Sequence, residues 1–158
     1  MSANYTISEI LLQIKSTAKN PNDIIRGLQQ NNTVAFHEVL RYAFDGLPWY
    51  RKELPAFTSD SSPEGLAPTS LWAEIKRFYI FKTAYNLPVK RKDQILTQIL
   101  ESISKTEIEL IRSMFDGSFK YTYGIDREAV EKAFPKLLGS QVVGRERPTS
   151  KIKRIDNI

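Results

Sequence analysis

Apolar residues recur at every third or fourth position along most of the chain, which is the spacing of one helical face. Within residues 6–20 the stripe consists of Ile7, Ile10, Leu11 and Ile14. Similar stripes predict helices within residues 20–31, 33–46, 69–88, 90–104 and 105–117. No segment of strand length alternates convincingly between apolar and polar residues, and no internal repeat is evident. The pattern therefore predicts an all-α fold, a single compact multi-helix domain.

Cap and turn residues mark the ends of these helices. Thr6 and Glu9 have the spacing of a capping box, as do Ser104 and Glu107. Gly46 is suited to end the third helix in a left-handed conformation. These residues give the predicted helices definite starts and stops.

Three segments set the expected organisation. Segment 69–88 is apolar around much of its circumference, which is typical of a central core helix. Residues 47–68 contain four prolines and are serine-rich in their second half, so we expect a long surface loop. Residues 140–158 hold five Arg or Lys against two acids. We therefore expect a helical domain over residues 1–139 and a basic C-terminal tail over 140–158.

Composition and charge narrow the class of protein. The 158 residues include no cysteine, which excludes disulfides, zinc–thiolate sites and thiol nucleophiles. No apolar run approaches the roughly 20 residues of a membrane span, and the N-terminus lacks the order of a signal peptide. We expect a cytoplasmic protein, in the host-cell cytoplasm if viral, with no membrane partner. The net charge of +5 and the pI of about 9.4 favour a polyanionic partner, nucleic acid first.

Residues suited to catalysis or metal binding are sparse. His37 is the only histidine and lies inside a helical pattern, where a partly buried helix residue is the simpler interpretation. The acidic residues are dispersed, with no Asp-x-Asp cluster for magnesium. There is no P-loop and no Gly-x-Gly-x-x-Gly, and no Lys-x-Asp-Gly of a covalent nucleotidyl enzyme. We therefore expect a non-catalytic protein without a cofactor.

Two basic groupings suggest contacts with phosphate. In "WYRKELP", Arg51 and Lys52 stand beside Trp49; the alternative is a loop packed by Trp49 with solvated charges. In "VKRKDQ", residues 90–92 place three cations at a helix start, where they oppose the helix dipole. Some other interaction would have to favour these cations, and an ordinary solvated turn is the alternative.

A third grouping lies in "SMFDGSFKYTYGIDREAVEKAFPKLLG", residues 113–139. Gly117 can end the preceding helix, Asp126 can cap a helix over Arg127–Phe134, and Pro135 can end that helix. Between Gly117 and Asp126 we expect a loop that exposes Lys120, Tyr121 and Tyr123.

Gly124 in this grouping would let the backbone approach a ligand closely, and the free N–H groups of a helix start suit phosphate oxygens. The cations available to add charge are Arg112, Lys120, Arg127 and Lys132. The alternative is a helix–turn–helix connection whose tyrosines cover the core.

Taken in order, these features resemble the N-terminal DNA-binding domain of ATP-dependent DNA ligases, in particular the T4-like phage type. That family shows an early "GL-x-YY-x-KK-x-P" segment, and this chain has "GLPWYRKELP" at residues 46–55. The family's domain closes with a Leu-Arg helix, a glycine turn, a short helix and "N-K-V-(aromatic)-P-G-L-I". Here "ELIRSMFDGSFKYTYGIDREAVEKAFPKLLG" keeps that order, with Phe134 and Pro135 at the ending. The resemblance covers roughly residues 5–139.

The resemblance implies an all-α domain that grips the backbone and minor-groove face of duplex DNA. The contact residues it carries over are Arg51, Lys52, Arg112, Lys120, Gly124 and Lys132. The turn "GSFKYTYG" is longer and more aromatic than the family's glycine turn. In a ligase a nucleotidyltransferase domain follows, whereas residues 140–158 carry no such motif.

We therefore expect a stand-alone, largely sequence-non-specific DNA-binding protein of phage type, in replication or repair. A further partner such as a sliding clamp or a polymerase is compatible with it. The alternative is an interaction module for a host or phage replication or transcription factor, which it would bind through loop 47–68 and exposed Trp49, Tyr50 and Phe57. A single continuous face of Arg51, Lys52, Arg112, Lys120 and Lys132 would favour DNA binding.

Overall fold

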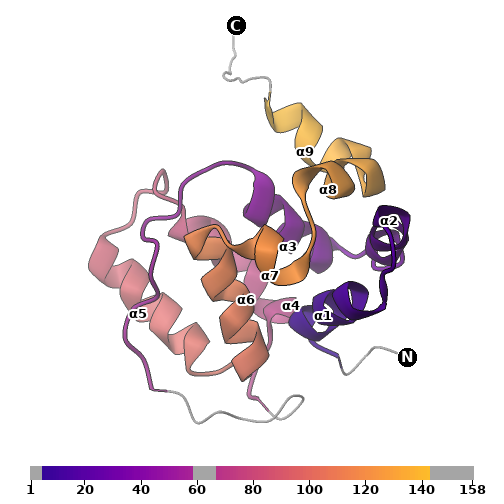
Figure 1. Ribbon diagram of the computed structural model, residues 1–158. Helices are drawn as coiled ribbons and strands as arrows, with labels where there is room; N and C mark the ends of the chain where they lie inside the picture. The colour runs from indigo at the N-terminus through magenta and orange to yellow at the C-terminus, as the bar shows by residue number, and fades with distance from the viewer. Residues whose placement is uncertain (1–4, 59–66, 143–158) are drawn as a thin grey trace, which may run out of the picture.

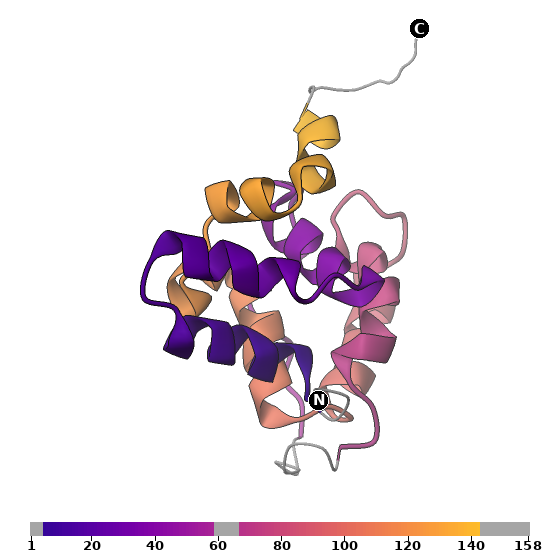
Figure 2. The same ribbon diagram turned by 90° about the vertical axis from the view of Figure 1, so that its right-hand side faces the viewer.

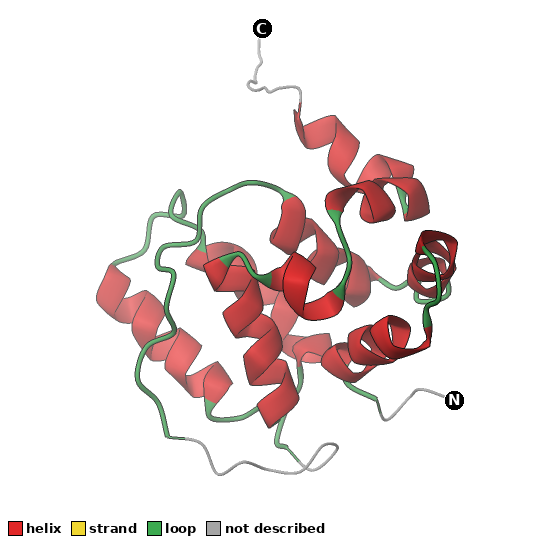
Figure 3. Ribbon diagram, in the orientation of Figure 1, coloured by secondary structure: helices red, strands yellow, loops and turns green. Residues whose placement is uncertain are grey.

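A computed structural model describes residues 5–58 and 67–142 of the chain. The described residues form helices and loops, without a β-strand (Figure 3). Figure 1 shows the arrangement of α1 (Ile7–Thr17), α2 (Pro21–Gln29), α3 (Val34–Phe44), α4 (Leu71–Glu74), the 3-10 helix η1 (Ile75–Phe81), α5 (Val89–Leu100), α6 (Lys105–Asp116), α7 (Phe119–Tyr123), α8 (Arg127–Ala133) and α9 (Pro135–Val142). One contiguous apolar core joins them. The prediction of an all-α, single-domain fold is confirmed.

Local and long-range caps fix the helix starts. The Thr6 hydroxyl accepts a hydrogen bond from Glu9 N at 3.2 Å, and the Glu9 carboxylate accepts one from Thr6 N at 2.8 Å, so the first predicted capping box is present. Asn20 caps α2 through its side chain in the same way. The start of α4 instead relies on a distant residue, because the buried Glu107 of α6 accepts a hydrogen bond from Leu71 N at 3.0 Å.

The segment expected as one central helix is shorter and partly tighter than predicted. It divides into the single turn of α4 and the 3-10 helix η1. Ile75, Phe78 and Phe81 are at most 1% exposed, so the predicted central position is confirmed. Tyr79 is 50% exposed, so one side of this segment faces solvent rather than the core.

Helices α1, α2, α8 and α9 lie next to one another along one side of the molecule (Figure 2). Gly27 lets α1 and α2 approach closely, because a Cβ at this position would lie 3.0 Å from Cγ1 of Ile14. Helix α9 continues through Val142, past the expected domain boundary at residue 139. The rest of the predicted basic tail lies outside the described residues.

The loop after α3 is fastened to the end of η1. Tyr50 N donates a hydrogen bond to Phe81 O at 2.8 Å, and Thr83 N donates one to Pro48 O at 2.9 Å. Trp49 and Lys82 form an isolated antiparallel bridge between the same two segments. The loop therefore follows a fixed path across the core.

The aromatic residues of this loop are not the free surface that the protein-binding hypothesis required. The Trp49 ring stacks on Phe115 of α6, with centroids 4.5 Å apart and planes 17° apart. The residues expected to be exposed, Trp49, Tyr50 and Phe57, are each partly buried against the core. That expectation is wrong because the Trp49 and Tyr50 rings pack against Phe115 of α6 and Phe81 of η1, and Phe57 packs against the core. Residues 59–66 of the expected loop lie outside the described residues.

Candidate nucleic-acid interface

A buried lysine holds the loop against the end of α3. Nζ of Lys82 lies 3.2 Å from Oδ1 of Asp45 and donates a hydrogen bond to Leu47 O at 3.0 Å. The two charged side chains are only 7% and 3% exposed. The same ammonium lies 3.7 Å from the centre of the Trp49 ring, a cation–π contact. Burial lowers the pKa of Lys82, and the charge of Asp45 partly offsets that effect. Lys82 thus serves the fold rather than a ligand.

A second buried lysine joins the turn after η1 to α5. Lys92 is 2% exposed, and its Nζ donates to Lys82 O at 2.8 Å. Tyr85 N donates to the same carbonyl at 3.1 Å. The turn and the first turn of α5 therefore converge on one oxygen atom. Burial lowers the pKa of the Lys92 ammonium, so this member of the predicted cation run at 90–92 also serves the fold.

The carboxylate of Asp93 connects the loop after α3 to α5 through hydrogen bonds. Its Oδ1 accepts hydrogen bonds from Tyr50 OH at 2.5 Å and from Arg51 Nη1 at 3.2 Å. Desolvation, followed by the bond to Asp93, raises the pKa of the Tyr50 hydroxyl. Nε of Arg51 donates to Glu53 O. The Arg51 guanidinium is therefore fixed in orientation while its side chain stays 33% exposed.

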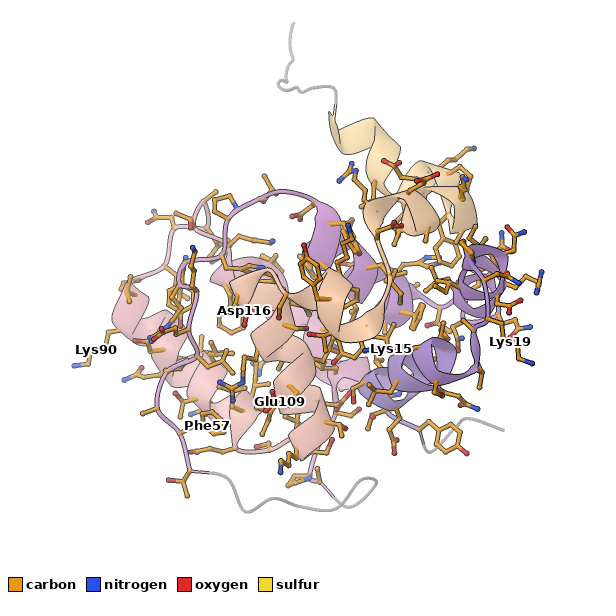
Figure 4. All side chains as sticks on the ribbon, in the orientation of Figure 1. Lys15, Lys19, Phe57, Lys90, Glu109 and Asp116 are labelled. Carbon is orange, nitrogen blue, oxygen red and sulfur yellow. The ribbon has the colours of Figure 1, made fainter. Side chains whose placement is uncertain are left out.

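Further cations lie around this carboxylate. Lys90 and Arg91 are exposed on the first turn of α5 and line a shallow depression together with Asp93. Figure 4 shows Lys90 projecting into solvent from the outer edge of the molecule. Lys52 is exposed next to Arg51. We call Arg51, Lys52, Lys90 and Arg91 the α5 patch; Asp93 lies within it, and the acidic residue Glu53 follows Lys52 in the chain.

The stretch after α6 forms a helix where the sequence suggested an open loop. Gly117 has φ of +83° and Gly124 has φ of +66°, left-handed values that glycine adopts most readily, and α7 lies between them. Phe119 and Tyr123 are 3% and 2% exposed, whereas Tyr121 is 79% exposed. The expectation that Tyr123 is exposed is wrong, because residues four apart on α7 share the face that meets the core.

The corner between α6 and α8 is held by α1. Nζ of Lys15 donates to Thr122 O at 2.9 Å, and a Cβ at Gly124 would lie 3.8 Å from Cγ of Lys15. Asp126 caps α8 as predicted, with its Oδ1 accepting from Ala129 N at 2.9 Å. The C-terminal end of α7 and the start of α8 are therefore fixed.

The surface of this corner carries both acidic and basic side chains. Nε of Arg112 lies 3.3 Å from Oε1 of Glu109. Figure 4 shows Glu109 and Asp116 along α6, on the same side of the molecule as Lys15. Lys120 is exposed and has no carboxylate within ion-pair distance in the part of the chain that the structure describes. Two more pairs are Arg127–Glu131 at 2.9 Å and Lys132–Glu128 at 3.0 Å. Most cations here are already partnered by acids.

The six predicted contact residues lie in three places. Arg51 and Lys52 belong to the α5 patch, whereas Arg112, Lys120 and Gly124 lie at the corner. Lys132 lies on α8, which packs against α2. No described contact joins these groups, so a single continuous contact face stays a prediction.

Two exposed cations of the α5 patch, Lys90 and Arg91, were considered from sequence but not included among the contact residues. Their association with Arg51 depends on Asp93, which is 42 positions away from Arg51. No local pattern displays a pairing at that separation. The basic run at the start of α5 was the one available signal.

Other kinds of site find little support in the described residues. His37 is partly buried, with its ring edge-on to Phe134 at 4.5 Å. Within the described residues no group of three or more His, Asp or Glu side chains is placed to hold a metal ion. None of the described helices has the length and apolar character needed to cross a bilayer.

Comparisons of the chain with protein-family models, curated proteins and solved structures found no match. The ligase-domain resemblance therefore stays a prediction that rests on the quoted motifs.

Proposed function

We propose that this protein binds duplex DNA through its phosphate backbone, largely without sequence specificity and without catalysing a reaction on it. The observation that carries the proposal is the α5 patch, where two distant segments place Arg51, Lys90 and Arg91 around Asp93, with exposed Lys52 next to Arg51 in the chain. Cations that neutralise phosphates release counterions from the duplex, which supplies sequence-independent affinity. The net charge of +5 adds long-range attraction.

The residues of the α5 patch have distinct roles in this proposal. Arg51 is oriented by Asp93 and by the carbonyl of Glu53, and its remaining N–H donors are available to phosphate oxygens. Lys52 and Lys90 act as mobile point charges at the edge of the patch. Such contacts position a duplex but carry no base-specific information.

The corner between α6 and α8 is a second, weaker contact in this proposal. Lys120 supplies a cation without an acidic partner among the described residues, and Gly124 keeps the backbone uncovered. Arg112 contributes less because Glu109 is its neighbour. A duplex that spans the α5 patch and the corner would cross the face of α6.

The protein-binding alternative loses the aromatic surface on which it depended, since Trp49, Tyr50 and Phe57 are partly buried. A sliding clamp or a polymerase as an additional partner is compatible with DNA binding. The proposal also keeps the expected cytoplasmic setting, in the host cell if the protein comes from a phage.

Fluorescence anisotropy with a short labelled duplex tests the proposal. Affinity should fall steeply between about 50 and 200 mM salt, with a logarithmic slope of about −3 to −4 for four phosphate contacts. Lys52→Glu combined with Lys90→Glu should weaken binding at least about tenfold at low salt. The control, Lys19→Glu with Lys136→Glu, makes the same change of charge at exposed lysines of the α1–α2 turn and of α9.

Figure 4 shows Lys19 at the opposite edge of the molecule from Lys90, and Figure 1 shows α9 well apart from α5, so the control changes charge away from the α5 patch. Absence of binding at low salt would contradict the proposal. An equal loss of affinity in the control variant would also contradict it, because net charge alone would then account for the binding.

A further inference from the structure

Two exposed tyrosines lie on η1 and on the turn that leads into α5. Tyr79 of η1 is 50% exposed, and Tyr85 of the turn before α5 is 41% exposed. Their rings meet edge to face, with centroids 5.2 Å apart and planes at 79°. The core tyrosines Tyr42 and Tyr123 are instead 5% and 2% exposed. The Tyr79–Tyr85 pair therefore presents aromatic surface to solvent that the core does not use.

Hydrogen bonds hold the turn that carries Tyr85 to the first turn of α5. Tyr85 N and Lys92 Nζ donate to the same carbonyl, that of Lys82, at 3.1 and 2.8 Å. Lys92 directly follows Arg91 and precedes Asp93, the centre of the patch. The turn that carries Tyr85 is therefore held to the helix turn that carries the cations.

We propose that the Tyr79–Tyr85 pair is a stacking site for an unpaired base, so that the preferred ligand is duplex DNA carrying a single-stranded segment. The inference rests on the proposed function, because the α5 patch supplies the phosphate contacts. In an edge-to-face pair, the ring that contributes its edge keeps both faces clear of the other ring. An unpaired base can stack on such a face whatever its sequence, since every base has a π-face.

The chemistry of the neighbouring residues fits one strand of DNA. Lys90 and Arg91 follow Tyr85 within six positions and are exposed, so they can hold the phosphates of the strand whose base stacks. A combination of aromatic side chains and a basic surface is the usual means of binding single strands without sequence preference. A fully paired duplex offers no free base to this pair, except at its ends.

The test compares two labelled DNAs by anisotropy: a duplex whose strands are joined at one end by a non-nucleotide linker and which is blunt at the other, and the same DNA with a single-stranded extension at the blunt end. A 2-aminopurine in the extension reports stacking through quenching of its fluorescence. The extended DNA should bind about fivefold or more tightly than the blunt one, with quenching. Tyr79→Ala with Tyr85→Ala should abolish the preference and the quenching while leaving the affinity for the blunt DNA unchanged.

Two controls separate the aromatic surface from other effects. Tyr79→Phe with Tyr85→Phe keeps the rings and should keep the preference. Tyr121→Ala removes a tyrosine that is 79% exposed on α7 and should change neither affinity. Circular dichroism confirms that the double alanine variant is folded, and Tyr85→Ala alone provides a milder second variant with the same direction of change.

The outcomes distinguish this inference from the proposed function. Equal binding of the two DNAs, or a preference that survives the double alanine change, would overturn the stacking site and leave backbone binding intact. Lack of binding to either DNA would overturn both. An equal effect of Tyr121→Ala would also overturn the stacking site, because any exposed tyrosine would then suffice.

Discussion

The ammonium of Lys82 lies 3.7 Å from the centre of the Trp49 ring, inside a protein whose other lysines are, apart from Lys92, exposed among the described residues. Asp45 provides the opposite charge at 3.2 Å. A cation enclosed in this way costs desolvation energy, which its aromatic and carboxylate neighbours offset. The basic composition of the chain therefore overstates the charge available to a ligand.

Replacement of this buried cation should destabilise the protein strongly. We expect Lys82→Met to lower the free energy of unfolding by about 3 kcal/mol, because it leaves Asp45 buried without its charge partner. The double variant Lys82→Met with Asp45→Asn should lose less, since no unpaired charge remains. Urea unfolding followed by circular dichroism measures both. Equal losses in the two variants would show that the ion pair is not the source of the effect.

Buried tyrosines should weaken the fold at alkaline pH. Burial raises the pKa of Tyr42, Tyr50 and Tyr123 above the ordinary value of 10.0. Above pH 10 the unfolded chain therefore loses tyrosine protons that the folded chain keeps, so the free energy of unfolding falls as the pH rises. The lowered pKa values of Lys82 and Lys92 act in the opposite direction, but only up to pH 10.5.

The difference between wild type and Tyr123→Phe isolates one tyrosine from these opposing effects. The variant should reduce the decline of unfolding free energy above pH 10 by about 1.4 kcal/mol per pH unit. Urea unfolding at several pH values between 9 and 11 checks the change of slope. Parallel plots of unfolding free energy against pH for the two proteins would contradict the expectation.

Left-handed glycines should resist substitution for backbone reasons alone. A Cβ at Gly117 would meet no atom within 4 Å, but its φ is +83°. We therefore expect Gly117→Ala to lower stability by about 1–2 kcal/mol. Gly117→Asn should cost less, because asparagine adopts this conformation more readily. Thermal unfolding of the two variants measures the order, and a reversed order would refute the backbone explanation.

Removal of an acid should strengthen the second DNA contact. Glu109 lies 3.3 Å from Arg112, and both side chains are about half exposed. Glu109→Gln frees the guanidinium and removes a negative charge, so we expect DNA affinity to rise about two- to fivefold at low salt. Anisotropy titrations measure the change, with Glu101→Gln at the C-cap of α5 as the matched exposed control. Unchanged affinity would confine the interface to the α5 patch.

Most features determined within a few residues were predictable from the sequence, although the second predicted capping box is absent, because the Ser104 side chain makes no cap hydrogen bond to α6. The capping box of Thr6 and Glu9, the Asp126 cap and the stop at Gly117 each depend on neighbours in the chain, and each is present. The amphipathic stripes predicted the all-α class for the same reason, since a helical face repeats locally.

Features that depend on packing between distant segments were not predictable. Nothing local indicates that Trp49 stacks on Phe115, or that Tyr123 turns inward while Tyr121 stays exposed. Residues 75–81, in the middle of segment 69–88, were part of a predicted α-helix but form the tighter η1. The candidate site shares this limit, because Arg51 joins α5 through Asp93, which no spacing in the sequence reveals.

The side-chain ammonium and the backbone carbonyl of Lys82 each make hydrogen bonds to other segments of the chain. Its ammonium binds Asp45 and Leu47 O, while its carbonyl accepts from Tyr85 N and Lys92 Nζ. Segments from α3, the following loop, the turn and α5 thus share one residue. Their amide protons should consequently exchange with deuterium as a single cooperative unit, and a ligand seated on any one of these segments should slow the exchange of all of them.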